Sequence, residues 1–173
     1  SQLGLLKSEK EVSCILSVFL QQLSTLDCTA IRAVYSAAGR YDLELVRSID
    51  RKLASFKNVK EFSEASRRTG RAMIRTVRAF KKSNLLSGFS DLVESKEAPG
   101  NYAVCLALAC NALGISEERA VTILLYTSAV SLLGAGVRLG HVTHEQAQQI
   151  LHSMKEEMTR CAKKSASIPW RSM

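Results

Sequence analysis

The chain has 173 residues and a formal net charge of +8, with 46% hydrophobic and 23% charged residues. This length suits one domain that buries roughly 70% of the surface exposed by the unfolded chain. The composition includes only two prolines and nine glycines, and the sequence shows little period-two alternation, which argues against a sheet protein. We therefore predict an all-α fold, a single domain over residues 1–173 with about seven helices around a buried central helical hairpin.

The five cysteines exclude two classes of small protein. They are odd in number and show no CxxC spacing, which argues against both a disulfide framework and a zinc knuckle. We expect free, mostly buried thiols and a reducing cytoplasm. No signal peptide is visible, and the chain begins at Ser1 rather than Met, which indicates a fragment or a trimmed chain.

Three amphipathic helices are predicted in the first third of the chain. Ser8 and Glu11 have the spacing of a capping box and predict a helix over residues 8–23. Asp27 is expected to cap a second helix over residues 28–38, and Asp42 a third over residues 43–55. The expected inward faces are Val12, Ile15, Leu16, Phe19 and Leu23 in the first helix, and Leu43, Val46, Ile49 and Leu53 in the third.

A fourth helix, over residues 60–82, is predicted to carry a basic stripe. Five cations recur at intervals of four, four, three and four, which places them on one side: Arg67, Arg71, Arg75, Arg78 and Lys82. The other side carries Phe62, Ala65, Thr69, Met73, Val77 and Phe80. Like charges at this spacing destabilise a helix by roughly 0.2–0.5 kcal/mol per adjacent pair.

Two interpretations of the basic stripe remain open at this point. In the first, the stripe is a solvated face paired with carboxylates from Glu44, Asp50 or Glu64. In the second, it is a partner surface that meets an acidic protein or, with weaker support, nucleic acid.

Residues 101–139 are predicted to form the central hairpin, after a loop over residues 83–100 that contains one short helical turn. Gly114 suits the end of the first apolar helix, and Ser116 suits the N-cap of the second. Helices that are apolar on nearly all sides must be covered by other elements, so we expect both to be wrapped.

A transmembrane hairpin is the alternative, because residues 120–137 reach the lower length limit of a membrane span. Polar residues inside the apolar runs and the strong charge of the other helices favour a buried hairpin in water instead. These polar residues are Asn111, Thr122, Thr127, Ser128 and Ser131.

The last helix is predicted over residues 144–164, with Thr143 and Gln146 as a second capping box. Its buried stripe is expected to be Ala147, Ile150, Leu151, Met154 and Met158. Residues 161–173 are predicted as a flexible tail in which Trp170 anchors the chain to a partner.

Few residues suggest site chemistry. His141 and His144 are weak metal-ligand candidates, and His144, Gln148 and His152 could share a helix face with Glu145, but no second cluster completes a metal shell. The sequence has no Gly-rich phosphate loop, nucleophile elbow or HExxH motif. We therefore predict neither a metal nor another cofactor, and no enzymatic activity.

The order and spacing of several residues are similar to those of a known family. Residues 54–70, ASFKNVKEFSEASRRTG, resemble a stretch with a glutamate, an E-A-S and a following glycine, here Glu61, Glu64, Ala65, Ser66 and Gly70. Tyr102, Val104 and ALACNALGI resemble a buried family helix, and Tyr126, Arg138, Leu139 and Gln148 match further family positions. Over residues 8–160 the chain resembles the urease accessory protein UreF family.

The chain also departs from that family's pattern. An N-terminal Gly-Gly-Phe-Ser-His segment is absent, and the histidine before the buried helix appears as Asn101. A Pro-Leu-Gly-Gln loop appears as residues 141–144, and an Arg-rich C-terminal tail is echoed only in residues 170–172. Because ends and loops concentrate contacts, these differences bear on partner binding more than on fold.

The resemblance implies an all-helical, non-enzymatic co-chaperone in the cytoplasm. Such proteins form homodimers, bind UreD (also called UreH) and the GTPase UreG, and help deliver nickel to apo-urease. We therefore predict the following partner-binding residues: Glu61, Glu64, Arg67, Arg71, Arg75, Arg78, Lys82, Arg138, Gln148 and Trp170. The alternative function is a helical nucleic-acid-binding module using the stripe of residues 67–82; without a helix-turn-helix and with few aromatics, it ranks second.

Overall fold

The computed structural model of the chain describes residues 9–57 and 59–173, and these residues contain helices but no strand. The elements are α1 (Glu9–Thr25), α2 (Asp27–Ala38), α3 (Leu43–Ser55), α4 (Lys60–Phe80), α5 (Asn84–Glu94), α6 (Tyr102–Ala112), α7 (Glu117–Arg138), α8 (His144–Ser153), α9 (Lys155–Ser165) and the 3-10 helix η1 (Trp170–Ser172). The all-α prediction is confirmed. The helices outnumber the predicted seven because α5 was expected to be a loop and the last helix is divided into α8 and α9.

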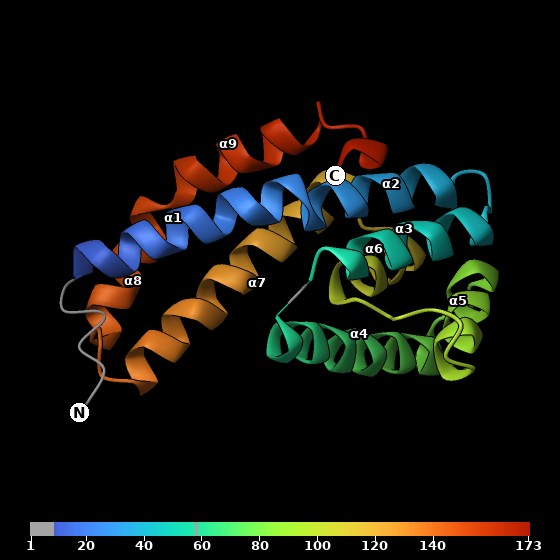
Figure 1. The fold of residues 1–173 in the computed structure, drawn as a ribbon, viewed down its shortest axis with the longest axis horizontal. Helices are drawn as coiled ribbons and strands as arrows, with labels where there is room; N and C mark the ends of the chain where they lie inside the picture. Colours follow the sequence, from blue (N-terminus) through green and yellow to red (C-terminus); the bar gives the residue numbers. More distant parts are fainter. Residues whose placement is uncertain (1–8, 58) are drawn as a thin grey trace.

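Helix α6 is the central helix of one half of the molecule (Figure 1). It packs between α4 and α2, and it also contacts α3, α5 and α7. Every residue from Ala103 to Cys110 is buried. Its alanines and cysteines are small, which lets the neighbouring helices approach closely. The predicted buried central helix is therefore confirmed for α6.

Helix α7 joins this half to a second group made of α1, α8 and α9 (Figure 1). One side of α7 is buried, through Ala120, Val121, Leu124, Leu125, Ala129 and Leu133. The other side is open, with Tyr126 51% and Val130 42% exposed. The prediction that both hairpin helices are wrapped is thus wrong for α7. Apolar composition alone does not distinguish a core helix from one that keeps an uncovered apolar face.

The turn between α6 and α7 has the predicted chemistry. Gly114 adopts a left-handed backbone with φ of 74°, and its N–H donates to the carbonyl of Asn111 at 3.0 Å. The Ser116 hydroxyl accepts the backbone N–H of Arg119 at 3.4 Å. Both helix boundaries therefore follow from local capping, as expected.

The caps of the early helices were predicted with mixed success. Asp42 accepts the backbone N–H of Leu45 at 2.9 Å and caps α3 as predicted. Asp27 does not cap α2: it is the first helical residue, the N-cap is Leu26, and the carboxylate binds Lys57 instead. The Asp27 carboxylate thus forms an ion pair with a residue thirty positions away instead of capping its own helix. The proposed Ser8 cap of α1 lies outside the described residues.

The buried face of α1 is rotated slightly from the predicted one. Ile15 is exposed, whereas Leu20 is fully buried beside Val12 and Leu16. The burial pattern follows the helices that contact α1, which are α2, α7, α8 and α9. For α3 the expected inward residues Val46, Ile49 and Leu53 are buried, and Leu43 is partly buried against the core.

The buried face of α4 is rotated from the one expected, although Val77 is buried and Met73 partly buried as predicted. Phe62 and Phe80 are exposed, and the side toward α6 carries Ser63, Gly70, Ile74 and Val77. A Cβ placed on Gly70 would lie 2.3 Å from the carbonyl oxygen of Gly100, so α4 approaches the backbone before α6 directly. Close helix contact requires small residues, which explains why the aromatic side chains lie elsewhere.

Residues 83–100 contain a full helix, so the loop prediction is wrong for most of this segment. The Ser83 hydroxyl accepts the backbone N–H of Leu86 at 3.4 Å and begins α5. The apolar stripe of α5 is buried, through Leu85, Leu86, Phe89 and Val93. This tertiary burial stabilises a helix whose serines and glycine weaken its local propensity.

At the C-terminal end, the predicted capping box is present and the predicted continuous helix is not. Thr143 and Gln146 cap each other reciprocally at the start of α8. The helix is interrupted at Met154, where α9 begins in a new direction. Residues 161–165 complete α9, and Trp170 packs partly buried against the core rather than projecting from a tail.

Two helical stretches, Glu9–Ala38 and Glu117–Arg138, are long and apolar enough to cross a membrane by length and composition alone. Core helices of water-soluble proteins also pass that test, and 50% of the apolar 18-residue window of the first stretch and 39% of that of the second are buried inside the protein.

Candidate protein-interaction surfaces

The residues predicted to bind partners fall in three separate places. Glu64, Arg67, Arg71 and Arg75 line one groove along α4. Arg138 and Gln148 line a second groove, between α7 and α8. Trp170 lies in η1, which contacts α2. The single set predicted from the sequence is therefore divided among distinct surfaces.

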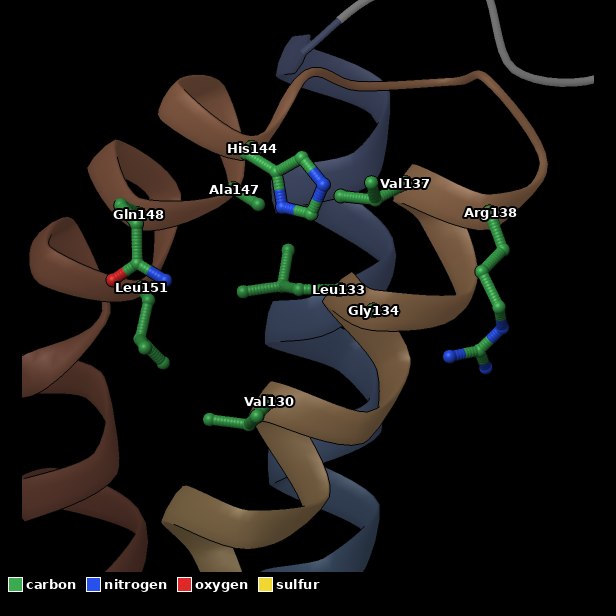
Figure 2. A pocket seen from close by; sticks show the side chains of 9 residues that line it. All are labelled: Val130, Leu133, Gly134, Val137, Arg138, His144, Ala147, Gln148 and Leu151. Atoms are coloured by element: carbon green, nitrogen blue, oxygen red, sulfur yellow. The ribbon is translucent and has the colours of Figure 1, made fainter.

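The groove between α7 and α8, here called the α7–α8 groove, has a volume of about 490 Å³. Val130, Leu133 and Val137 line it from α7, and Ala147 and Leu151 line it from α8. Figure 2 shows these apolar side chains between the two helices. The walls of the groove are therefore largely hydrocarbon, which favours an apolar occupant.

Polar side chains lie at the edges of the α7–α8 groove. Figure 2 shows His144 and Gln148 projecting from α8, while Arg138 lies on the side of α7 turned away from α8. A Cβ placed on Gly134 would come within 3.6 Å of the Arg138 guanidinium, so this side chain folds back along its own helix. An apolar centre with a polar edge is the usual composition of a protein interface.

The groove continues into a stripe on α7, here called the α7 apolar face, in which Tyr126 and Val130 are exposed and the other members are partly buried. It consists of Ile123, Tyr126, Thr127, Val130, Gly134 and Val137, which recur at helical spacing on the side opposite to the buried one. Tyr126 and Val130 are one helical turn apart, and neighbouring exposed apolar side chains mark interaction sites more often than isolated ones do.

The two candidate metal ligands do not form a metal site with other residues. Within residues 9–57 and 59–173, no group of three or more histidine, cysteine, aspartate or glutamate side chains could hold a metal ion. His144 is exposed at the start of α8, and His141 is partly buried in the turn before it.

The groove along α4, here called the α4 basic groove, has a volume of about 480 Å³ and is lined by Glu64, Arg67, Arg68, Arg71, Ala72 and Arg75. It lies between two rows of side chains at i, i+4 spacing, one through Arg68 and the other through Arg71. The sequence prediction included all these cations except Arg68. The periodicity of the neighbouring row at residues 64, 68 and 72 would have identified it.

The carboxylates expected to neutralise the stripe do not do so. Asp50 is fully buried under α6, and Glu44 pairs with Arg47 at 2.7 Å. Glu64 lies 4.0 Å from Lys60. The interpretation that these three acids pair with the stripe is therefore wrong, because α3 and α4 present them to other partners.

Only one member of the stripe, Arg78, forms an ion pair among the described residues. It pairs with Asp91 at 2.7 Å and with Glu94 at 3.9 Å, both on α5. Lys82, just beyond the end of α4, and Glu61, in its first turn, are exposed. The structure therefore separates Arg78, which binds α5, from the arginines of the α4 basic groove.

A buried polar cluster fixes the start of α6, and the sequence analysis missed it. Asp50 accepts the backbone N–H groups of Gly100 at 2.7 Å and Asn101 at 2.9 Å. The Asn101 side-chain amide also donates to Asp50, at 2.7 Å. Burial raises the pKa of the Asp50 carboxyl above its ordinary value of 3.8, while these donors and Lys57 oppose the shift. The carboxylate acts as a cap supplied by another helix.

The same cluster extends to the start of α4. Lys57 donates to Asp27 at 2.7 Å and to Ser66 at 3.2 Å. The Ser66 hydroxyl accepts the backbone N–H of Tyr102 at 3.1 Å. Ser66 and Gly70, identified in the sequence from the family resemblance, thus hold α4 against the first turn of α6.

The tail residue Trp170 contacts the chain's own helices. The Lys52 ammonium lies 5.7 Å from the centre of its ring and donates to the carbonyl of Arg171 at 2.5 Å. Trp170 thus packs against the chain itself, and its role in binding a partner stays a prediction.

Four of the five cysteines, Cys28, Cys105, Cys110 and Cys161, are buried, as predicted, and Cys14 is exposed. Burial raises the pKa of all four buried thiols, which keeps them protonated and poorly nucleophilic.

Comparison with known proteins identifies the relatives of this chain. It is 28% identical over 147 residues to the urease accessory protein UreF of Corynebacterium glutamicum (strain R), an alignment that covers 85% of this chain and 64% of that protein. It is also 28% identical over 151 residues to the urease accessory protein UreF of Trichodesmium erythraeum (strain IMS101), an alignment that covers 87% of this chain and 65% of that protein. It is 23% identical over 150 residues to the urease accessory protein UreF of Sporosarcina pasteurii, an alignment that covers 86% of this chain and 74% of that protein.

The first two relatives are longer than this chain, which spans 64–65% of their length. The UreF family profile matches residues 6–155. This match includes α1 to α8, and with them the buried polar cluster at the start of α6, the α4 basic groove and the α7–α8 groove. Because it extends over most of the sequence, the chain belongs to the UreF family.

Proposed function

We propose that the chain is a urease accessory protein that works without catalysis of its own, as a scaffold during assembly of the nickel centre of urease. The observation that carries this proposal is the family match over residues 6–155. The relatives that align with more than four fifths of the chain are themselves named urease accessory protein UreF.

The expected partners are UreD (also called UreH), UreG and apo-urease, and a second copy of the chain in a homodimer. The α7 apolar face and the α7–α8 groove support a function that depends on binding other proteins. A helix with Tyr126 and Val130 about half exposed gains free energy when a partner removes this surface from water. Arg138, His144 and Gln148 at the edge supply polar contacts that select among partners.

The nucleic-acid alternative has less support from the surface charge. Arg78 is already paired with Asp91 and Glu94, and Glu64 lies among the arginines of the α4 basic groove. These carboxylates interrupt the continuous positive track that a phosphate backbone requires. We place the protein in the cytoplasm, where urease maturation partners would meet it.

The test is co-expression with the UreD and UreG homologues of one urease operon, followed by affinity purification after nuclease treatment. We expect at least one of the two to co-purify with the chain at about 0.05 M salt and to be retained less well at about 0.3 M, because salt screens charged contacts. Recovery of the chain without either homologue at the lower salt concentration would contradict the proposal.

A further inference from the structure

The α4 basic groove is an unneutralised concentration of positive charge. Four arginines line it, Arg67, Arg68, Arg71 and Arg75, and none forms an ion pair with a carboxylate among the described residues. Glu64, the one acid in the groove, lies 4.0 Å from Lys60. The charge is therefore available to a partner.

Two of these arginines are also incompletely hydrogen-bonded. Arg67 and Arg71 are partly buried, and the Nε atom of each is shielded from solvent without a hydrogen-bond partner among the described residues. Arg71 otherwise makes one long contact, 3.5 Å to the carbonyl of Pro99. Because the chain itself leaves these guanidiniums without a carboxylate and only partly hydrogen-bonded, charge-assisted hydrogen bonds from a partner to their other nitrogens would displace no existing ion pair.

The groove has the shape expected of a helix-binding surface. Its two rows, residues 64, 68 and 72 and residues 67, 71 and 75, are ridges at i, i+4 spacing. Helices pack by placing one such ridge between two others. Helix α4 is also accessible, because α6 and α5 are the helices that pack against it and its outer side is uncovered in Figure 1.

From these observations we propose that the α4 basic groove binds an acidic helix of a partner protein, whose carboxylates follow one i, i+4 ridge and meet Arg67, Arg68, Arg71 and Arg75. A ridge of glutamates repeats at the same interval of about 6 Å as the arginines, so several charge-assisted hydrogen bonds form in register. This inference goes beyond the proposed function, because it concerns the class of segment bound and does not depend on the urease assignment.

The test uses two synthetic helical peptides of identical composition, one with its glutamates on a single i, i+4 ridge and one with the same glutamates distributed around the helix. Binding to the full chain is measured by fluorescence anisotropy at about 0.05 M salt. We expect the ridge peptide to bind tighter than the distributed one. In NMR titrations, it should shift the amide resonances of α4 rather than those of α9.

A charge-matched pair of variants tests the location. R68Q/R75Q removes two exposed guanidiniums from the groove, and K163Q/K164Q removes two exposed cations from α9. Glutamine is a good helix former, and circular dichroism verifies that each variant is folded. We expect R68Q/R75Q to weaken the ridge peptide about three- to tenfold and K163Q/K164Q less than twofold. The single variants R68Q and R75Q should each give part of the loss.

Several outcomes would overturn the proposal. Equal losses in the two double variants would reduce the binding to general attraction by net charge. Equal affinity for the two peptides would show that the arrangement of glutamates on one i, i+4 ridge does not matter for binding. Tighter binding of a DNA duplex of the same charge, also lost in R68Q/R75Q, would make the groove a nucleic-acid site instead.

Discussion

Replacing Gly70 with alanine is the sharpest test of how α4 and α6 are held together. The new Cβ would lie 2.3 Å from the carbonyl oxygen of Gly100 and 3.0 Å from backbone atoms of Asn101 and Tyr102. All three neighbours are backbone, so no side chain can rotate away. The helices must instead separate by roughly 1 Å, which opens the close-packed contact around Ile74 and Val77.

The size of the effect follows from two opposing contributions. Alanine favours the helix over glycine by about 1 kcal/mol, whereas overpacking of a tight contact costs typically about 1–3 kcal/mol and occasionally more. Because the overlap is with rigid backbone, we expect the upper part of that range and a net loss of about 1–2 kcal/mol in the free energy of unfolding. In thermal unfolding this corresponds to a midpoint lower by roughly 2–8 °C.

The assay is urea denaturation followed by far-UV circular dichroism, with G134A as the matched control. Gly134 is also inside a helix, but its added Cβ would meet only the end of the Arg138 side chain at 3.6 Å. G134A should therefore be unchanged or more stable by up to about 1 kcal/mol. A G70A variant as stable as the wild type, or more stable, would refute the close approach of α4 to α6.

Three further predictions concern the polar cluster, the α7 apolar face and the tail. Because burial raises the pKa of Asp50 in the folded chain, the protein should become less stable as pH rises from about 3.8 through the folded pKa. In urea denaturation across this pH range, the difference in stability between the wild type and D50N should therefore change with pH. A difference that stays constant would contradict the raised pKa. V130D should dissociate the expected homodimer in sedimentation velocity while changing the stability of the subunit by less than about 0.5 kcal/mol. As the control, S131D alters an exposed neighbour outside the α7 apolar face and should leave the dimer intact. A dimer that survives V130D would exclude the α7 apolar face as the dimer interface. W170A should lower the thermal midpoint by roughly 2–8 °C, because it loses about 1–2 kcal/mol of packing and the Lys52 contact. An unchanged midpoint would mean that η1 does not stabilise the fold.

Features with local causes could be predicted from the sequence. The caps at Asp42, Ser116 and Thr143 each depend on residues within one helical turn, and the structure contains all three. The burial of α6 on all sides could also be predicted, because its uncharged sequence leaves no polar face to contact water.

Features that depend on distant residues could not be predicted in this way. Asp50 has the pattern of a surface residue of α3, and only the fold brings it to the backbone of Gly100 and Asn101, fifty residues away. The buried face of α4 was predicted only in part, because its closest contact is made by Gly70, which carries no hydrophobic signal. Helix α5 was missed because its stability comes from burial rather than from propensity.

The candidate surfaces were predicted residue by residue but not as surfaces. Arg138 and Gln148 were chosen for family resemblance, yet their proximity to Val130 and Leu133 becomes visible only when α7 and α8 are placed side by side. Arg68 was overlooked because the stripe was traced along a single row of the helix. A surface groove requires two adjacent rows.

The most direct test of the account is the nickel content of urease purified from cells whose urease operon lacks its own UreF, with and without expression of this chain. We predict that the chain raises nickel per urease active site well above the level of the empty vector, together with urease activity. Nickel content that stays at the empty-vector level, with the chain present and folded in the same cells, would contradict the proposed role in urease maturation.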